Sequence, residues 1–189
     1  MRGYGTRTLP PPSRALVFRS VVTIAEASTV ADYDDLRALL REYGDWAFGL
    51  SEISAVAPTY AGFEDELANL PGVYSRPRGR LLIARVDAAP AGCVALKPHT
   101  GDEAELKRLY VRPHFRAMKI GRRLVTTLLD EARALDYRRV VLDSHRMMTS
   151  AHAIYRAAGF LEVDAPPGFS ADLKPHVVFM QLELPTLSR

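Results

Sequence analysis

Basic side chains gather around one glycine in the second half of the chain. They flank Gly121, where apolar residues begin to recur with a helical period. The first turn of a helix presents unpaired backbone N–H groups and about half a positive charge, so it attracts anions. Glycine lets a ligand approach the backbone because it has no Cβ. These features predict a cradle for a pyrophosphate group. Its cationic side chains are Arg116, Lys119, Arg122 and Arg123.

The residues that precede this cradle have the pattern of a β-strand. The run contains Leu106, Leu109, Tyr110 and Val111, and a proline at 113 ends it because proline cannot donate to a sheet ladder. A strand, a basic turn and a helix then follow one another, which is an arrangement that holds phosphate. On the residues alone, a solvated basic turn before an ordinary core helix is an equal alternative.

Two segments resemble the signatures of one known family. L-Y-V-R-P followed by R-x-x-x-x-G is similar to the acyl-coenzyme A signature of the GNAT family of N-acetyltransferases. Lys119 stands where that family carries its first glycine, and this is a departure from the pattern. The segment A-H-A-I-Y-R-A-A-G-F at 151–160 resembles the family's A-x-x-L-Y-x-x-x-G-F helix. The resemblance extends over 80–184 and is weaker in the first 80 residues.

The resemblance implies that acetyl-CoA is the acyl donor. In the family the pantetheine arm lies along a strand as an added pseudo-strand, and here that strand offers Leu109, Tyr110 and Val111. The phosphates would rest on the loop that follows, and the Arg116 guanidinium is suited to bind phosphate oxygens in a bidentate way. Lysine at 119 is flexible and cationic, so we expect binding to survive there. The expected cofactor-binding residues of the loop are Arg116, Ala117, Met118, Lys119, Ile120, Gly121, Arg122 and Arg123.

The resemblance also implies a general acid. Tyr155 stands where many members carry the tyrosine that protonates the departing thiolate, and a phenol has a reference pKa of about 10. The alternative is an aromatic residue of the core with a satisfied hydroxyl group. Met148 stands where members often carry an asparagine that contacts the cofactor arm, so that contact is missing or falls to Ser144 or Ser150.

Transfer to an amine also needs a general base, because a free amine is mostly protonated at neutral pH. Glu105 is the candidate, since several members place a catalytic glutamate four residues before the position of Leu109. An ion pair with Lys107 or Arg108 is the alternative role of this carboxylate. A strand amide such as that of Val111 would polarise the thioester carbonyl. The rival groups are Glu103, Asp102 and His99, with His114 nearer the phosphates.

Hydrophobic periods and turn residues predict the elements that position these groups. Residues 1–14, rich in Gly, Pro and Arg, predict a flexible arm, and 15–189 a single domain. Ser28 or Thr29 is the expected N-cap of the first helix, and Gly44 its expected end. The expected strands are 17–24, 80–86, 91–97, 106–111, 138–143, 161–163 and 177–184, and the expected helices are 30–43, 63–70, 121–136 and 149–158.

The order of these elements predicts an α/β fold. The strand–helix–strand unit at 105–143 must form a right-handed crossover, so its two strands are expected to lie parallel. The remaining strands are expected to be antiparallel. We therefore expect a mixed, mostly antiparallel central sheet of six to seven strands with helices on both faces. The late apolar strand at 177–184 is compatible with a homodimer.

Composition excludes several classes of protein. The 189 residues suit one domain with a substantial core, and the net charge of +3 gives no sustained basic face, so we expect no nucleic-acid partner. Cys93 is the lone cysteine and is expected in the core. The five histidines show no ligand spacing, so no metal is expected. No apolar run approaches the ~18 residues of a membrane span, and no secretory leader is seen, so a cytoplasmic protein is expected.

The acceptor can be placed only by region. By the resemblance it enters beside the first two helices, at 43–74, whose aromatic and acidic residues suit a cationic amine or an ordinary helix pair. A small amine, an amino acid and a peptide N-terminus stay open. We expect an N-acetyltransferase that works by direct attack in a ternary complex, with a non-catalytic coenzyme A sensor as the alternative. The acceptor-side residues are Trp46, Phe48, Tyr60, Glu64 and Glu66.

Overall fold

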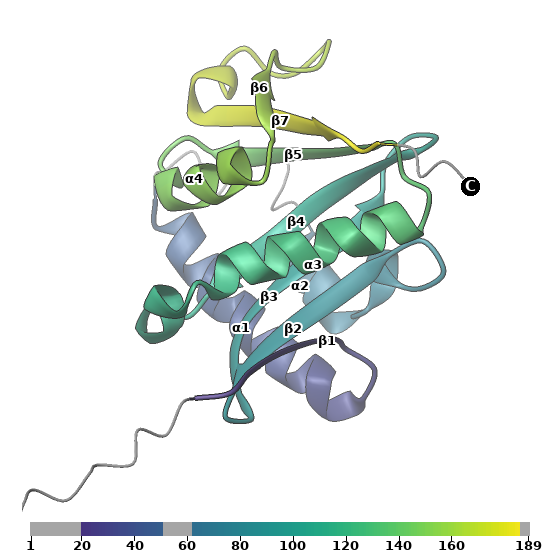
Figure 1. The fold of residues 1–189 in the computed structure, drawn as a ribbon. Coiled ribbons are helices and arrows are strands. Elements are labelled where there is room, and N and C mark those ends of the chain that lie inside the picture. The colour runs from purple at the N-terminus through teal and green to yellow at the C-terminus, as the bar shows by residue number, and fades with distance from the viewer. Residues whose placement is uncertain (1–19, 51–61, 186–189) are drawn as a thin grey trace, which may run out of the picture.

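A seven-stranded sheet organises the computed structural model, which describes residues 20–50 and 62–185 (Figure 1). The strands lie side by side in the order β1-β2-β3-β4-β5-β7-β6. This confirms the expected mixed sheet with helices on both faces. The predicted arm at 1–14 lies outside the described residues. The strands are β1 (Val22–Glu26), β2 (Arg80–Val86), β3 (Ala89–Pro98), β4 (Glu103–Val111), β5 (Arg139–His145), β6 (Leu161–Val163) and β7 (Val177–Glu183).

The sheet divides between β4 and β5. These two strands are parallel, joined through α3 (Ile120–Ala134) as the strand–helix–strand pattern predicts, and the other neighbouring strands are antiparallel. Their register runs only from Glu103 opposite Arg139 to Glu105 opposite Val141. Beyond that point β5 continues to pair with β7 along its whole length. In the described part of the chain, the β5-facing edge of β4 therefore has no partner strand after Glu105.

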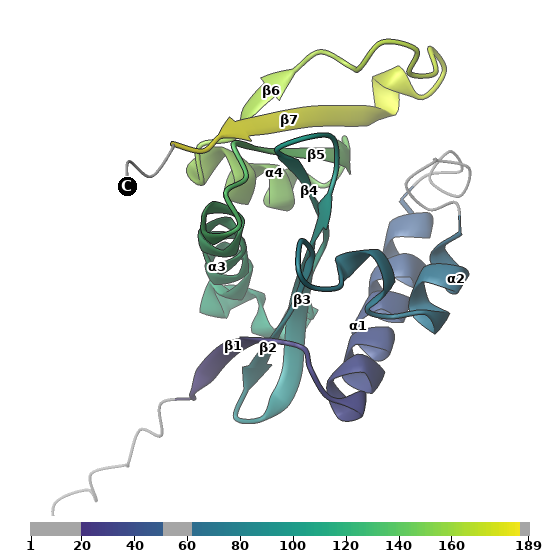
Figure 2. The same ribbon diagram turned by 90° about the vertical axis from the view of Figure 1, so that its right-hand side faces the viewer.

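Each face of the sheet has its own core (Figure 2). On one face α1 (Val30–Phe48) and α2 (Phe63–Ala68) cover β2 to β4, and Leu36, Leu39 and Leu40 of α1 are wholly buried. On the other face lie α3 and α4 (Thr149–Ala157), with Leu124 and Leu128 wholly buried. Burial of a leucine side chain stabilises a fold by about 2 kcal/mol, so these apolar stripes fix the helices on the sheet.

The start of α1 is as predicted, but its end is not. Thr29 is the N-cap: its hydroxyl accepts from the Asp32 N–H, and the Asp32 carboxylate accepts from the Thr29 N–H. The prediction that Gly44 ends this helix is wrong, because the helix continues to Phe48. Gly44 is buried, and a Cβ there would lie 2.7 Å from Cε1 of Phe63. The glycine therefore allows α2 to approach α1.

Three 3₁₀ helices complete the described chain: η3 (Gly72–Tyr74), η4 (Pro113–Met118) and η5 (Lys174–His176). The predicted basic turn before α3 is η4. Cys93 is wholly buried, as expected, and burial raises the pKa of its thiol to about 12. Within 20–50 and 62–185, no helix is long and apolar enough to cross a membrane. The same residues contain no group of three or more metal-ligating side chains placed to hold an ion.

Candidate active site

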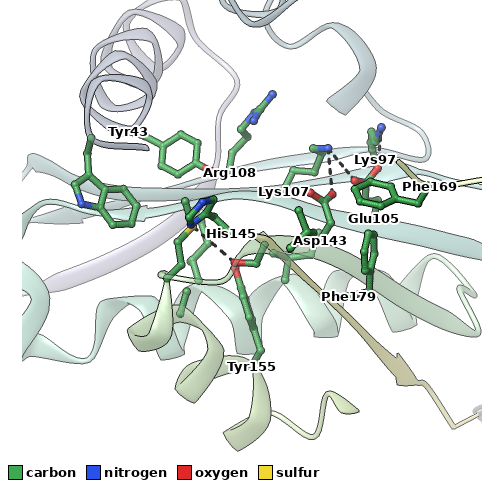
Figure 3. A pocket seen from close by; sticks show the side chains of 17 residues that line it. Tyr43, Lys97, Glu105, Lys107, Arg108, Asp143, His145, Tyr155, Phe169 and Phe179 are labelled. Atoms are coloured by element: carbon green, nitrogen blue, oxygen red, sulfur yellow. Dashed lines mark hydrogen bonds and ion pairs between the residues drawn. The ribbon is translucent and has the colours of Figure 1, made fainter. Parts of the chain in front are cut away.

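Two adjoining cavities lie where β4 and β5 separate. The first, here called the carboxylate pocket, has a volume of about 270 Å³ and is lined by Glu105, Asp143 and Tyr155 among others (Figure 3). The second, here called the strand–helix pocket, has a volume of about 370 Å³ and lies between β4 and the start of α3 and α4. The two cavities share wall residues, so they lie next to each other. The shared residues are Trp46, Leu109, Met148 and Ala151.

A β-bulge in β4 lies beside both cavities. Cys93 is opposite Tyr110 and Ala95 is opposite Lys107, so β4 has one residue more than β3 over this stretch. Arg108 lies in the bulge with φ 59°, in the left-handed region. A side chain adopts that conformation at a cost of about 1–2 kcal/mol, so the surrounding structure must hold it there.

The extra residue reverses the alternation of side chains along β4. Before the bulge Ala104 and Leu106 pack in the α3–α4 core, and after it Leu109 and Val111 pack against the same core. Side chains at the intervening positions must face the α1–α2 side, because successive residues of a strand point to opposite faces. Those residues are Glu105, Lys107 and Tyr110.

Contacts with α2 hold Arg108 in this conformation. Its Nε and Nη2 donate to the two carboxylate oxygens of Glu66 at 2.8 and 2.7 Å, and its guanidinium lies 4.9 Å from the centre of the Phe63 ring. The Tyr74 hydroxyl also donates to Glu66, at 2.9 Å. Burial raises the pKa of Glu66, but the hydrogen bonds and charge of Arg108 outweigh burial and hold it below the usual range. Glu66, expected on the acceptor side, is thus the partner of a buried arginine.

Four charged side chains form a row across β3, β4 and β5 in the carboxylate pocket. Lys97 Nζ and Lys107 Nζ lie 2.8 Å from Oε2 and Oε1 of Glu105, and Lys107 Nζ lies 3.8 Å from Oδ1 of Asp143. Figure 3 shows these groups together beside Phe169 and Phe179. The signs alternate along the row, so each carboxylate has a lysine for a neighbour. We refer to Lys97, Glu105, Lys107 and Asp143 as the charged row.

The two carboxylates of the charged row differ in their affinity for a proton. Burial raises the pKa of Glu105, but the charges and hydrogen bonds of Lys107 and Lys97 outweigh burial, so its pKa lies below the usual range. Burial also raises the pKa of Asp143, where the attraction of Lys107 is opposed by the negative charge of Glu105, and the net shift is upward. The surroundings therefore favour the ionised form of Glu105 and the protonated form of Asp143.

The structure brings the predicted acid and base into one cavity. Tyr155 projects from α4, and Glu105 lies on β4, where its predicted pairing with Lys107 is present. Neither residue's catalytic role is tested by this placement, so both remain predictions. Among the rivals, Glu103 pairs with Arg139 at 2.6 Å and Asp102 with Arg138 at 3.2 Å, outside the cavity wall. His99 is exposed, and His114 packs on Phe115 with ring centres 4.0 Å apart.

The predicted cofactor residues divide into two groups. The strand residues Leu109, Tyr110 and Val111 line the strand–helix pocket, together with Arg116 and Gly121. The remaining loop residues lie outside its wall. Among them Ile120 is wholly buried and Arg123 donates to the Val22 carbonyl at 3.1 Å. The residues outside the wall are Ala117, Met118, Lys119, Ile120, Arg122 and Arg123.

Two residues at the start of α3 show why glycine is favoured in this loop. Lys119 has φ 58° and ψ 23°, a left-handed conformation that glycine adopts freely and lysine at a cost of about 1–2 kcal/mol. The departure from the family pattern therefore keeps the backbone shape that a glycine would take. At Gly121, a Cβ would lie 2.9 Å from Cδ1 of Ile154, so this glycine lets α3 approach α4.

The Arg116 side chain, which was expected to bind phosphate, contacts other groups of the protein. Its Nε donates to the Val111 carbonyl at 3.2 Å, and its guanidinium carbon lies 5.9 Å from the centre of the Trp46 ring. The side chain is exposed at the wall of the strand–helix pocket. Of the two serines proposed to replace the missing asparagine, Ser150 lines this pocket and Ser144 lines the carboxylate pocket.

The residues expected on the acceptor side lie in different places, and the binding of an acceptor there stays a prediction. Tyr43 and Trp46 line the carboxylate pocket, whereas Phe48 packs edge to face on Phe63 with ring centres 5.8 Å apart. Glu64 is exposed, and Tyr60 lies outside the described residues. Sequence reasoning missed Lys97, Asp143, His145, Phe169 and Phe179. In V-V-L-D-S-H the residues change from apolar to polar at Asp143, and polar residues at the end of a predicted strand were a signal for Asp143 and His145.

Comparisons with known sequences agree with this geometry. The sequence pattern of the Acetyltransferase (GNAT) family matches residues 36–160. An uncharacterized N-acetyltransferase of Schizosaccharomyces pombe is 35% identical over 167 residues, which cover 87% of this chain and 96% of that protein. N-acetylaspartate synthetase of Mus musculus is 29% identical over 121 residues, which cover 60% of this chain and 40% of that protein.

Solved structures share the fold. An acetyltransferase of the GNAT family from Staphylococcus aureus has a TM-score of 0.69 at 18% identity, and covers 87% of this chain and 100% of its own. PaiA N-acetyltransferase from Thermoplasma acidophilum, in complex with coenzyme A, has a TM-score of 0.67 at 21% identity, and covers 87% of this chain and 99% of its own. At these identities the likeness establishes the architecture and leaves the substrates to the residues of the site.

Proposed function

Because the chain belongs to the Acetyltransferase (GNAT) family, we propose that it transfers the acetyl group of acetyl-CoA to a primary amine by direct attack in a ternary complex. The observation that carries this proposal is the pair of adjoining cavities at the division between β4 and β5. One suits an extended cofactor arm, and the other places charged and phenolic groups beside it. Two substrates bound there would meet at the shared wall.

The strand–helix pocket suits the acyl-CoA arm. After Glu105, the described β5 residues offer β4 no ladder partner, so the backbone of 106–111 has an edge on which an extended chain can pair. Leu109, Tyr110 and Val111 lie on this edge. The phosphates would then reach the first turn of α3, where N–H groups lack intrahelical acceptors. Arg116, Lys119, Arg122 and Arg123 surround that turn with positive charge.

The proposed chemistry is a direct displacement. The neutral acceptor nitrogen attacks the thioester carbonyl, a C–N bond forms, and the C–S bond breaks as the tetrahedral intermediate collapses. Tyr155 donates its phenolic proton to the departing thiolate, and the phenolate recovers a proton from the former amine nitrogen. The Val111 amide is the proposed donor to the developing oxyanion. A carboxylate of the charged row takes the first proton from the incoming ammonium group.

The acceptor side has both aromatic and charged groups. Tyr43 and Trp46 of α1, with Phe169 and Phe179, supply aromatic surface around the charged row. Such a wall suits an amine whose carbon skeleton stacks or packs while its nitrogen meets a carboxylate. The name of the related N-acetylaspartate synthetase states an acetylated amino acid as product. Amino acids, aspartate among them, therefore belong in an acceptor panel beside small amines and peptide N-termini.

Coenzyme A calorimetry and a thiol-release assay test the proposal together. We expect folded protein to bind coenzyme A, and to release thiol from acetyl-CoA only when an acceptor from the panel is present. The departures at Lys119 and Met148 favour one second candidate, a sensor that binds coenzyme A without catalysis. A sensor would bind coenzyme A and give no acceptor-dependent thiol across the panel. Absence of any affinity for coenzyme A or acetyl-CoA would contradict both candidates.

A further inference from the structure

The two carboxyl groups of the charged row have unequal surroundings, and this inequality bears on the proton that an acceptor must lose. We infer that Asp143 on β5 takes the proton from the acceptor ammonium group, and that Glu105 and Lys107 position it. This inference rests on the proposed amine acetylation. It assigns the base to a different strand from the glutamate that the family resemblance implies.

Both oxygens of Glu105 are engaged by cations. Oε1 lies 2.8 Å from Lys107 Nζ and Oε2 lies 2.8 Å from Lys97 Nζ, with 10% of the Glu105 side chain exposed. An incoming ammonium group would have to displace a lysine to reach either oxygen. The same two lysines stabilise the ionised form, which weakens this carboxylate as a base. Glu105 is therefore better suited to hold Lys107 than to accept a proton.

The Asp143 side chain is more exposed than that of Glu105, and its distance to Lys107 is longer. Its side chain is 25% exposed, and the lysine nearest to it in the charged row, Lys107, lies at 3.8 Å, beyond hydrogen-bond distance. It lines the same cavity as Tyr155, and Figure 3 shows both side chains at that cavity. An ammonium group in the cavity can thus approach this carboxylate without displacing a bound lysine.

The charges that face Asp143 adjust its affinity for a proton. The neighbouring strand β4 contributes Glu105, Lys107 and Arg108, and Lys97 of β3 acts on Asp143 through its ion pair with Glu105. His145 of β5 and the Tyr155 phenol of α4 line the same cavity. Burial, and then the charge of Glu105 and a hydrogen bond with it, raise the pKa of Asp143 against the attraction of Lys107 and Arg108. A base is most effective when its pKa approaches the working pH, so this upward shift suits the role.

The proton account closes with this assignment. The acceptor ammonium gives one proton to the Asp143 carboxylate before the nitrogen attacks. The second proton leaves the nitrogen as the amide forms and restores the Tyr155 phenol, whose own proton has gone to the thiolate. Asp143 then releases its proton to water, so each turnover forms one amide and one thiol and liberates one proton.

Substitution of each carboxylate tests the assignment by pH–rate profiles. Asp143→Asn should lower kcat at neutral pH by about 100-fold or more, replace the acidic limb of the kcat/KM profile with a rise near the pKa of the acceptor amine, and leave coenzyme A affinity unchanged. Its activity should recover as the pH rises toward the pKa of the acceptor amine, because the free amine then needs no base. Glu105→Gln should lower kcat less than Asp143→Asn does, because Glu105 positions the base and does not accept the proton. Its acidic limb should move to lower pH, because a negative neighbour of Asp143 is lost.

The opposite pattern overturns the inference: a limb that survives in Asp143→Asn and disappears in Glu105→Gln. Carboxyl carbon NMR of the coenzyme A complex decides the same question without turnover, since Asp143 should titrate at higher pH than Glu105. If wild-type protein acetylates no acceptor, the proposed function fails and the assignment fails with it. If wild-type protein is active and Asp143→Asn is equally active, only the assignment fails.

Discussion

At the scale of single residues, one hydroxyl group separates the two interpretations of Tyr155. Only 5% of this residue is exposed, and its ring packs against Phe160 with centres 5.8 Å apart. Phenylalanine would preserve that packing and remove only the oxygen. The packing interpretation and the acid interpretation therefore make different predictions for one substitution.

We expect Tyr155→Phe to lower kcat for thiol release by about 100-fold, the lower end of what a positioned general acid contributes. Coenzyme A affinity, measured by calorimetry, should stay unchanged. Tyr137→Phe is the matched control, because Tyr137 is also buried, donates to the Arg78 carbonyl at 3.0 Å and lines neither cavity. It should lower the free energy of unfolding by about 1 kcal/mol without changing kcat. An unchanged kcat in Tyr155→Phe would leave this tyrosine as a packing residue.

At the scale of elements, the contact between α1 and α2 depends on the missing side chain of Gly44. A Cβ at this position would lie 2.7 Å from a ring atom of Phe63, which is itself buried. By contrast, a Cβ at Gly49, the C-cap of α1, would have its nearest neighbour at 3.5 Å. Gly44 thus lies in the last part of α1 and Gly49 directly after it, and of these two glycines only Gly44 is required by packing.

Gly44→Ala should lower the free energy of unfolding by about 1–3 kcal/mol, because overpacking outweighs the gain of about 1 kcal/mol in helix propensity. Gly49→Ala should change it by no more than about 0.5 kcal/mol. Urea unfolding of the two variants and the wild type measures both values. Equal or greater stability in Gly44→Ala would show that α2 can move away from α1 without loss.

Local pattern predicted most of the elements, and tertiary contacts decided the remainder. Apolar runs and period-3.6 patterns placed most of the described strands and the four α-helices to within a few residues, as at α3, where 121–136 was expected and Ile120–Ala134 is found. The first strand is an exception, because it was expected at 17–24 and the described strand is Val22–Glu26. The prediction for Gly44 was wrong because the sequence does not distinguish a glycine that ends a helix from a glycine that allows another helix to pack closely. The bulge at Arg108 could not be predicted, because an extra residue exists only relative to the partner strand.

Sequence reasoning found the residues of the candidate site that lie in the two family signatures, and missed others. Tyr155 and the strand residues of β4 were found because short segments match a family pattern. Asp143 was missed because its proposed role depends on Lys107 and Glu105, which lie on a neighbouring strand. In the sequence, a single aspartate in a predicted strand indicates only a residue that faces solvent. Its surroundings become visible only when β4 and β5 lie side by side.

At the scale of the whole molecule, an ion pair joins a peripheral helix to the centre of the sheet. Glu66 of α2 binds Arg108 of β4, with 19% and 3% of their side chains exposed. The pKa of Glu66 is lower in the folded protein than its ordinary value of 4.5. A lowered pKa means that the pair stabilises the fold fully above that ordinary value, and that the stabilisation is lost as the pH falls through the lowered pKa.

Glu66→Gln should therefore lower the free energy of unfolding by about 3 kcal/mol at pH 7, because it leaves a buried arginine without its counter-ion. The difference from wild type should shrink as the pH falls below the ordinary glutamate range. Urea unfolding at neutral and acidic pH measures it. Glu162→Gln is the control, since the Glu162–Arg156 pair is about half exposed, and it should cost less than about 1 kcal/mol at either pH. A difference for Glu66→Gln that grows on acidification would contradict the sign.

Because β4 contains one extra residue in its bulge, the number of residues in that strand decides which face each side chain occupies, as much as the residue types do. Deleting any one residue between Lys107 and Tyr110 would restore perfect pairing with β3 and would turn half of the strand over. If the first half of the strand turned over, Glu105 and Lys107 would point into the apolar core under α3 and α4. If the second half turned over, Tyr110 would point into that core, and Leu109 and Val111 would point to the opposite face. A substitution in β4 changes one side chain, whereas the loss of one residue would change the face to which half of the strand's side chains point.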